Sequence, residues 1–317
     1  MVTQKIKRVN CKDRKHFGPS ANKNKRYSDS VNICKARSHC RETRVDGTFP
    51  VNAREDFKMV KLTIFYTSEV EVDVFQEDVT GNSNGIQSTA DLIVLILRDS
   101  SSSTQAFGPL VTSSERQLQS SVGCRAMLEP GEYVVVTLAF NIWTLFTKPP
   151  VQRCNYVMSI NSLKALMIEE VFTKTRKYEY ALADAIYQLT ICKGQREGIR
   201  ESVTVYSLTL GWSGGMYVVE NRSPDKSIHV QCDCKESLNI VSTRGNLTSV
   251  DSIPPLHRQV IMILTQLERT APYYVSRRLR HRMTLTQTGL GDWAPAGVNH
   301  EPFLTLNVEG LHAPRPL

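Results

Sequence analysis

The feature that most constrains the fold is a succession of short strand-like segments with little helical periodicity between them. Residues 58–66 and 70–75 alternate apolar and polar side chains with period 2, as half-buried strands do. Residues 91–97 and 133–140 are apolar almost throughout, which indicates strands in the centre of a sheet. A further strand is expected near 122–128, and a Glu-Pro-Gly turn at 129–131 separates it from the segment at 133–140. Short strands at this spacing predict an antiparallel β-sandwich.

The second half of the chain is also rich in strand patterns and adds one helix. Strands are expected near residues 156–160, 203–210, 215–220, 227–234, 239–241, 258–265 and 273–283. Apolar residues recur at helical spacing between residues 177 and 193, and Gly194 follows where a helix would end.

The predicted fold is therefore mainly β, with two antiparallel β-sandwich-like domains and one helix (about 177–193) in the second. We expect a disordered basic tail at residues 1–30, a sandwich domain at 31–150 and a second β-rich domain at 151–317.

The positive charge of the chain is concentrated at its beginning. Hydrophobic residues make up 41% and charged residues 22% of the sequence, as in folded soluble proteins. The net charge is +8, but residues 1–44 hold thirteen Lys and Arg against three acids, which leaves the remainder at −2. The body therefore offers no broad basic face, so we expect no nucleic-acid partner and do not expect membrane contact.

The eight cysteines do not form a metal-site pattern. No apolar leader is visible in residues 1–30, so we expect a cytoplasmic protein with reduced thiols. Cys232 and Cys234 are the one close pair, and on a strand both sulfurs point to the same face as Val230. Core packing is the interpretation we adopt for this pair, because no second Cys/His pair has zinc-site spacing.

No catalytic motif stands out. The sequence lacks a G-x-S-x-G elbow, a phosphate loop, an H-E-x-x-H pair and a dinucleotide glycine motif. Four histidines occur late in the chain, without metal-site spacing: His257, His281, His300 and His312. From the residues we predict no catalytic site, no cofactor and no metal.

Weaker candidates for a site are a glycine-rich loop at 211–215, a basic run at 277–282 and a row of acids. We interpret the loop as a strand connection with Trp212 at the sandwich edge, and the basic run as exposed surface. The acidic residues Glu69, Glu71, Asp73, Glu77 and Asp78 could bind calcium, but alternating acids on a strand are usually a solvated face.

Several unbroken strings resemble the C-terminal region of the small-optic-lobes (SOL) type of calpain, a calpain-like cysteine protease. The strings are VNICKAR (31–37), ETRVDGTFP (42–50), LEPGEYVVV (128–136), AFNIW (139–143), LADA (182–185), KGQR (193–196), VVENR (218–222), HVQCDC (229–234), VSTRG (241–245), PPLHRQV (254–260) and GLHAPRP (310–316). Together they span residues 31–317.

The resemblance implies the part of such a protease that follows its catalytic core. The zinc-finger cysteine pairs and the catalytic Cys, His and Asn contexts of that family are not found in the sequence, so no catalytic role carries over. The chain therefore looks like a fragment, a partial gene model or a late-starting isoform. It is expected to be a non-catalytic regulatory or protein-interaction region, inactive alone, whose partner is a calpain protease core or another protein.

Two alternatives stay open. One is a calcium- or lipid-responsive adaptor, which requires acidic loops gathered at one sandwich end or a basic concave face. The other is an unrecognised cysteine hydrolase using Cys124 or Cys192 with a distant histidine, which requires a thiol of lowered pKa in a cleft.

Overall fold

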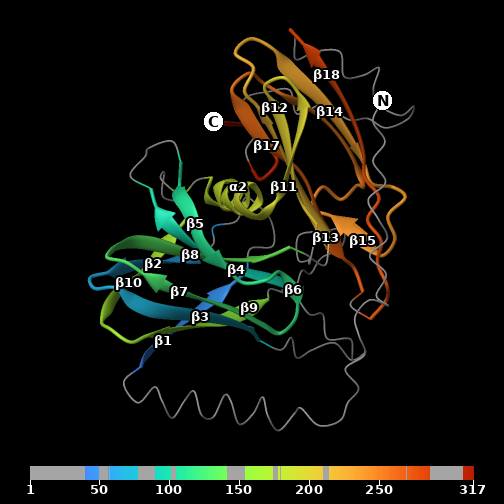
Figure 1. Cartoon of the computed structure of the whole chain (residues 1–317). Coiled ribbons are helices and arrows are strands. Elements are labelled where there is room, and N and C mark those ends of the chain that lie inside the picture. Colours follow the sequence, from blue (N-terminus) through green and yellow to red (C-terminus); the bar gives the residue numbers. More distant parts are fainter. Residues whose placement is uncertain are drawn as a thin grey trace.

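Two β-sandwiches lie on either side of one α-helix in the computed structural model (Figure 1). The structure describes residues 40–49, 56, 58–77, 90–100, 105–140, 154–173, 178, 180–209, 214–268, 270–285 and 310–317. The predicted mainly β, antiparallel fold is confirmed. The helix α2 (Ala181–Lys193) falls within the predicted range. The expected tail at 1–30 lies outside the described residues.

The first sandwich packs a four-stranded sheet on a six-stranded sheet. The four-stranded sheet has the order β1 (Arg41–Thr48), β9 (Asn155–Ser162), β3 (Ser68–Gln76), β7 (Ser121–Leu128). The six-stranded sheet has the order β10 (Leu166–Phe172), β2 (Lys58–Ile64), β8 (Gly131–Ala139), β4 (Asp91–Asp99), β5 (Phe107–Ser113), with β6 (Gln117–Leu118) paired to β4. The apolar side chains of these strands form the core between the sheets.

The strand pairing carries the first sandwich past the expected boundary at residue 150. β9 lies between β1 and β3, with Arg41 opposite Ser162, and β10 pairs with β2. The strand expected to open the second unit, at 156–160, is therefore part of the first sandwich. Periodicity shows that a segment is a strand but not which distant strand it pairs with, which explains the difference.

The second sandwich packs a six-stranded sheet on a three-stranded sheet. The larger sheet has the order β11 (Gln195–Arg200), β12 (Val203–Leu208), β13 (Gly214–Asn221), β17 (His257–Gln266), β15 (Ile240–Ser242), with β19 (Arg315–Pro316) paired to β17. The smaller sheet has the order β16 (Thr248–Ile253), β14 (Ser227–Asp233), β18 (Arg278–Thr284).

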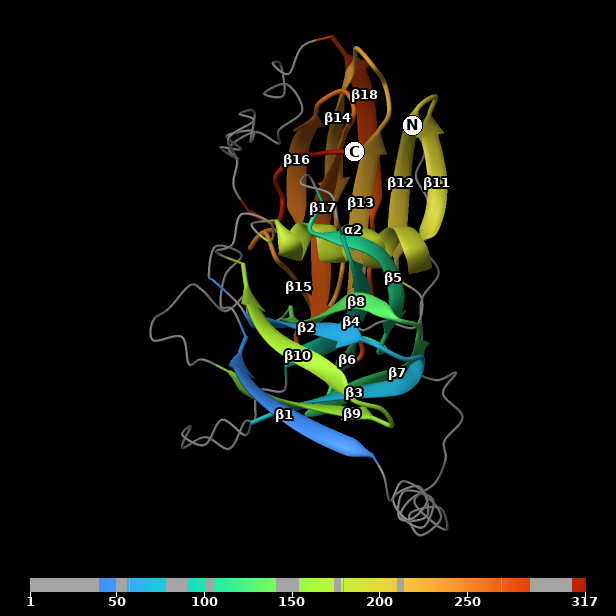
Figure 2. The same cartoon turned by 90° about the vertical axis from the view of Figure 1, so that its left-hand side faces the viewer.

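The larger sheet of the second sandwich is covered on both faces. Val205 and Val219 lie in the core between its two sheets. Met216 and Ile263 point the other way, into a core shared with α2 and the first sandwich. Figure 2 shows α2 crossing the strands of this sheet. Burial on both faces explains the unbroken apolar runs at 216–219 in β13 and 260–264 in β17.

A buried ion pair joins the two sandwiches. Arg116, just before β6, donates through Nε to both carboxylate oxygens of Asp91 at 2.9 and 2.8 Å. Its terminal nitrogen reaches β17, 2.7 Å from the Leu264 carbonyl and 2.5 Å from Thr265 Oγ1. Thr265 in turn donates to Asp91 at 2.9 Å. Gly214 lies at the same contact between the sandwiches. A Cβ at this position would lie 2.0 Å from the Leu264 carbonyl oxygen.

The C-terminal segment, residues 310–317, packs between α2 and β17. Leu311 is buried in the core shared by helix and sandwiches. The backbone carbonyl of His312 accepts a hydrogen bond from Gln259 at 2.8 Å, and Arg315 pairs with Arg258 across β19 and β17. The GLHAPRP string is therefore part of the interface between α2 and the second sandwich.

Candidate functional site

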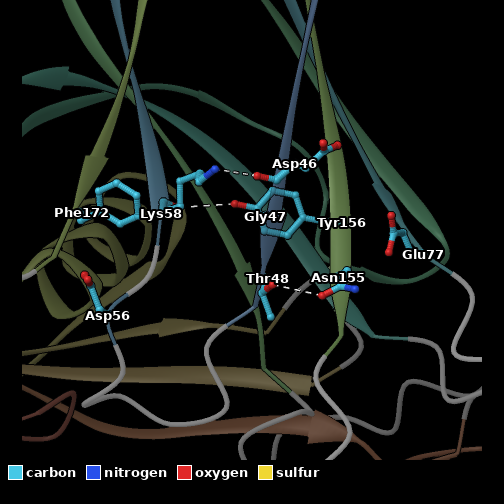
Figure 3. Close-up of a pocket in the computed structure, with 9 residues that line it drawn as sticks. All are labelled: Asp46, Gly47, Thr48, Asp56, Lys58, Glu77, Asn155, Tyr156 and Phe172. Atoms are coloured by element: carbon cyan, nitrogen blue, oxygen red, sulfur yellow. Dashed lines mark hydrogen bonds between the residues drawn. The ribbon is translucent and has the colours of Figure 1, made fainter.

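A polar pocket of about 460 Å³ opens at one end of the first sandwich (Figure 3). Its lining residues come from strands distant in sequence: Asp46, Gly47, Thr48, Asp56, Lys58, Glu77, Asn155, Tyr156 and Phe172. The start of β2 and β9 and the end of β1, β3 and β10 meet here. None of these residues except Glu77 was a candidate from the sequence.

The positive charge of Lys58 is neutralised by acceptor groups next to it. Its ammonium group donates to the Asp46 carbonyl and to the Glu170 carboxylate, each at 2.9 Å. The other charged residues of the lining are three carboxylates, Asp46, Asp56 and Glu77. The pocket is therefore negative, even with Lys58 in its wall.

Tyr156 forms the floor of this pocket against Gly47. A Cβ on Gly47 would lie 2.2 Å from the Tyr156 ring, so only glycine fits at this position of β1. The ring also packs on Phe49, with centroids 4.6 Å apart. Burial, with a smaller effect from Glu170, raises the pKa of Tyr156 to about 12, so its hydroxyl stays protonated at neutral pH.

The chemistry that this lining supports is binding of a cationic or hydrogen-bonding group rather than nucleophilic attack. Thr48 Oγ1 donates to the Asn155 side chain at 3.0 Å, which holds both polar groups at the rim. Cys154 lies beside the pocket, and burial, then Glu77, raises the pKa of its thiol to about 11. A thiol in that state is not activated at neutral pH.

The two cysteines considered as nucleophiles lie in different surroundings. Cys124 is buried in the first core, and burial raises the pKa of its thiol to about 12, with Asp73 adding to the shift. This is opposite to the lowered pKa that a cysteine hydrolase requires. Cys192 is exposed near the end of α2. The structure does not bring the two together in the pocket.

The acidic row on β3 is partly neutralised by a neighbouring strand. Arg125 on β7 donates to Glu71 at 2.9 Å and to Glu69 at 3.4 Å. Asp73 lies over Gly123, where a Cβ would be 2.0 Å from its carboxylate. Among the described residues no group of three or more His, Cys, Asp or Glu side chains could hold a metal ion. Asp78 lies outside them.

Cys232 and Cys234 pack in the core of the second sandwich, as their spacing predicts. Both are fully buried with their sulfurs 3.9 Å apart. The hydrogen bond with the Cys232 thiol, and then burial, raise the pKa of Cys234 far above its usual value. The pair is structural, because both side chains fill the core of the second sandwich.

The basic run at 277–282 is not uniformly exposed. Arg277 is buried, donates to Ser207 Oγ at 2.7 Å and lies over the Tyr217 ring. The prediction of exposed surface is therefore wrong for Arg277, because the residue precedes β18 and turns into the sandwich. Arg278 and Arg280 are exposed. Of the loop at 211–215, only Gly214 and Gly215 lie in the described part, at the start of β13.

His312 is half-buried and held neutral by its contacts. Its Nδ1 lies 2.8 Å from the Val260 carbonyl, which can only accept, so Nδ1 carries the proton. Nε2, 3.0 Å from Thr243 Oγ1, therefore accepts. Burial, and then the positive charge of Arg244, hold the pKa of His312 well below its usual value. His300 lies outside the described residues.

We expect the stability of the protein to fall as the pH drops below about 6.5, the pKa of an unfolded histidine. Because the folded pKa of His312 is lowered, its contribution is complete above that value and is lost as the unfolded state takes up the proton first. At pH 5.5 the loss attributable to His312 is about 1.4 kcal/mol. Denaturant unfolding of the wild type and of His312→Gln at pH 7.5 and 5.5 measures it. An equal loss in both proteins would contradict the assignment.

The geometry describes a protein with two antiparallel sandwiches joined through a buried helix and with a polar pocket at one end of the first sandwich. Residues 189–287 match the family described as Calpain-D-like, C-terminal domain. The match begins in α2 and extends just past β18, and it supports a calpain-like C-terminal region over these residues. No helix of the described residues is long and apolar enough to cross a membrane.

Proposed function

We propose that this chain is a non-catalytic regulatory and protein-interaction region of a calpain-like cysteine endopeptidase of the SOL type. Its partner is a calpain protease core or another protein, with no nucleic acid and no membrane involved. We also propose a cytoplasmic location. Cys232 and Cys234 lie close together as free thiols, as expected in a reducing compartment.

An exposed apolar end of the first sandwich is the observation that carries this proposal. Phe65 and Tyr66, in the β2–β3 turn, have 53% and 67% of their surface exposed. Leu163, in the neighbouring β9–β10 turn, and Met127 near the end of β7 are 50% and 65% exposed. The pairing of Ile64 with Leu166 brings the two turns together, at the end opposite the pocket. Clustered aromatic and methionine side chains of this kind are enriched in protein interfaces.

Several charged groups around this apolar end are paired with one another. Arg98 lies 3.5 Å from Glu129, and Lys61 lies 3.0 Å from Glu132. This local neutrality provides no strong attraction to an anionic membrane, and it favours a partner that covers the turns with an apolar surface of its own. The buried contacts of Arg116 with Asp91 and with the Leu264 carbonyl hold the two sandwiches together, so this apolar end would be part of a rigid body.

The test uses the chain, a separately expressed SOL-type protease core and an active-site-directed cysteine probe. We expect no labelling of the native chain above a denatured control, with or without calcium, because Cys124 is a protonated, buried thiol. We expect the core to bind the chain, and the double variant Phe65→Ser, Tyr66→Ser to bind at least tenfold more weakly.

The matched control is Leu238→Ser, which removes an equally exposed apolar side chain, 61% exposed, from the second sandwich. It should leave binding unchanged. Labelling of a single cysteine of the native chain would overturn the non-catalytic assignment. Undiminished binding of the double variant would overturn the role of the apolar end, and calcium-dependent binding to vesicles would favour the adaptor alternative.

A further inference from the structure

Two arginines face each other across β17 and β19, at the interface between the second sandwich and α2. Arg258 and Arg315 are directly opposite in the antiparallel register. In Figure 1 the C-terminus lies beside β17, with which β19 pairs. Like charges directly opposite on neighbouring strands destabilise a sheet unless something neutralises them.

Neither guanidinium group has an acceptor among the described residues. The Nε atoms of Arg258 and Arg315 are both buried without a hydrogen-bond partner there, and Arg258 is only 7% exposed. Three other described arginines, whose side chains are at most 9% exposed, each bind a carboxylate: Arg116 binds Asp91, Arg244 binds Asp251 and Arg277 binds Glu197. Buried arginines are normally paired, so the lack of an acceptor from the described residues sets Arg258 and Arg315 apart from these three arginines.

Tyrosine rings of α2 and the turn before it hold the two arginines in place. The Arg258 guanidinium lies over Tyr187, 4.6 Å from the ring centroid, and that of Arg315 lies over Tyr180 at 3.3 Å. Stacking satisfies the faces of the guanidinium groups but leaves their N–H edges free to bind an acceptor. Tyr180 is also the N-cap of α2 and makes no side-chain capping hydrogen bond, so the positive end of the helix dipole lies at the same place.

The nearby carboxylates offset only part of this positive charge. Asp184 accepts a hydrogen bond from the backbone of Ala106 at 2.8 Å, and burial raises its pKa despite the opposing effects of Arg315 and Arg258. Glu220, opposite Arg258 on β13, binds Arg222 at 2.5 Å. The two arginines together therefore keep an excess of positive charge.

We propose that Arg258 and Arg315, with the N-terminal turn of α2, bind a phosphate oxyanion. A tetrahedral anion offers several acceptor oxygens to two guanidinium edges at once, and its charge removes the repulsion between the arginines. The anion can be free phosphate or the phosphate group of an ester. This site does not depend on the function proposed above.

The test measures thermal unfolding of the full chain in phosphate and in chloride at equal ionic strength and pH. We expect inorganic phosphate to raise the midpoint of unfolding by about 3 °C in a saturable manner, because a ligand of the folded state stabilises it by mass action. In Arg315→Gln this rise should be lost. The same variant should be as stable as the wild type in chloride, or more stable, because one of two like charges is gone.

The matched control is Arg280→Gln, which removes the same charge from an exposed position of β18. It should keep the full phosphate effect. If the arginines only support the tyrosine rings, Arg315→Gln will be less stable by the same amount in both salts. That result, or a wild type that phosphate does not stabilise more than chloride does, would overturn the proposal.

A parallel titration with O-phosphoserine identifies the source of the anion. Stabilisation equal to that by inorganic phosphate indicates that the site accepts a phosphate ester. Stabilisation by inorganic phosphate alone indicates that the enclosed arginines admit only the free ion. Either result supports the oxyanion site, and stabilisation by neither probe refutes it.

Discussion

Replacing Arg116 by methionine is expected to lower the free energy of unfolding by about 3–5 kcal/mol. The side chain is fully buried and binds Asp91, the Leu264 carbonyl and Thr265 at once. Methionine fills much of the volume but leaves the Asp91 carboxylate inside the protein without its cation. The penalty comes mainly from that uncompensated charge, and it falls on the contact that joins the two sandwiches.

Urea unfolding of wild type and variant measures this loss. Arg125→Met is the control, since Arg125 binds Glu71 and Glu69 on the exposed face of β3 and its removal should cost less than about 1 kcal/mol. Adding Asp91→Leu to Arg116→Met should restore part of the stability, because the unpaired charge is then gone. A single variant that loses less than 1 kcal/mol would show that the joint does not depend on this pair.

The strands and the helix could be predicted because their signals are local. The period-2 pattern of 70–75 identifies β3, and the apolar run at 91–97 identifies β4, whose side chains are buried on both faces. The apolar positions before Gly194 identify α2 within a few residues of its start. Cys232 and Cys234 needed only the alternation of a strand to be assigned to the core.

The features that depend on long-range pairing could not be predicted in this way. β9 joins the first sandwich through partners 80 (Gln76–Tyr156) to 121 (Arg41–Ser162) residues away in sequence, which periodicity does not encode. The pocket brings Asp46, Lys58 and Asn155 together only because of that pairing. Arg258 and Arg315 each look like a surface arginine in sequence, and only the register of β17 and β19 places them opposite each other.

The strings that carry the family resemblance meet in three dimensions, which accounts for residues that no local pattern explains. Arg244, from VSTRG, donates to Asp251 at 2.7 Å. Gln259, from PPLHRQV, donates to the same Asp251 oxygen and to the carbonyl of His312, from GLHAPRP. This buried polar network fixes the C-terminal segment on β17, so these three strings act as one structural unit.

Leu311→Ala is expected to reduce the free energy of unfolding by about 3 kcal/mol. Leu311 is buried, 4% exposed, in the core that α2 shares with both sandwiches, and the truncation leaves a cavity that the polar network around His312 prevents from closing. The C-terminal segment then loses its apolar anchor, and we expect faster hydrogen exchange in β17 and α2 than in β3. Leu317→Ala is the control, because Leu317 is 38% exposed and its removal should cost less than about 1 kcal/mol. Equal effects of the two substitutions would contradict the role of residues 310–317 as part of the interface, since only an anchored segment makes the buried leucine the costlier one to lose.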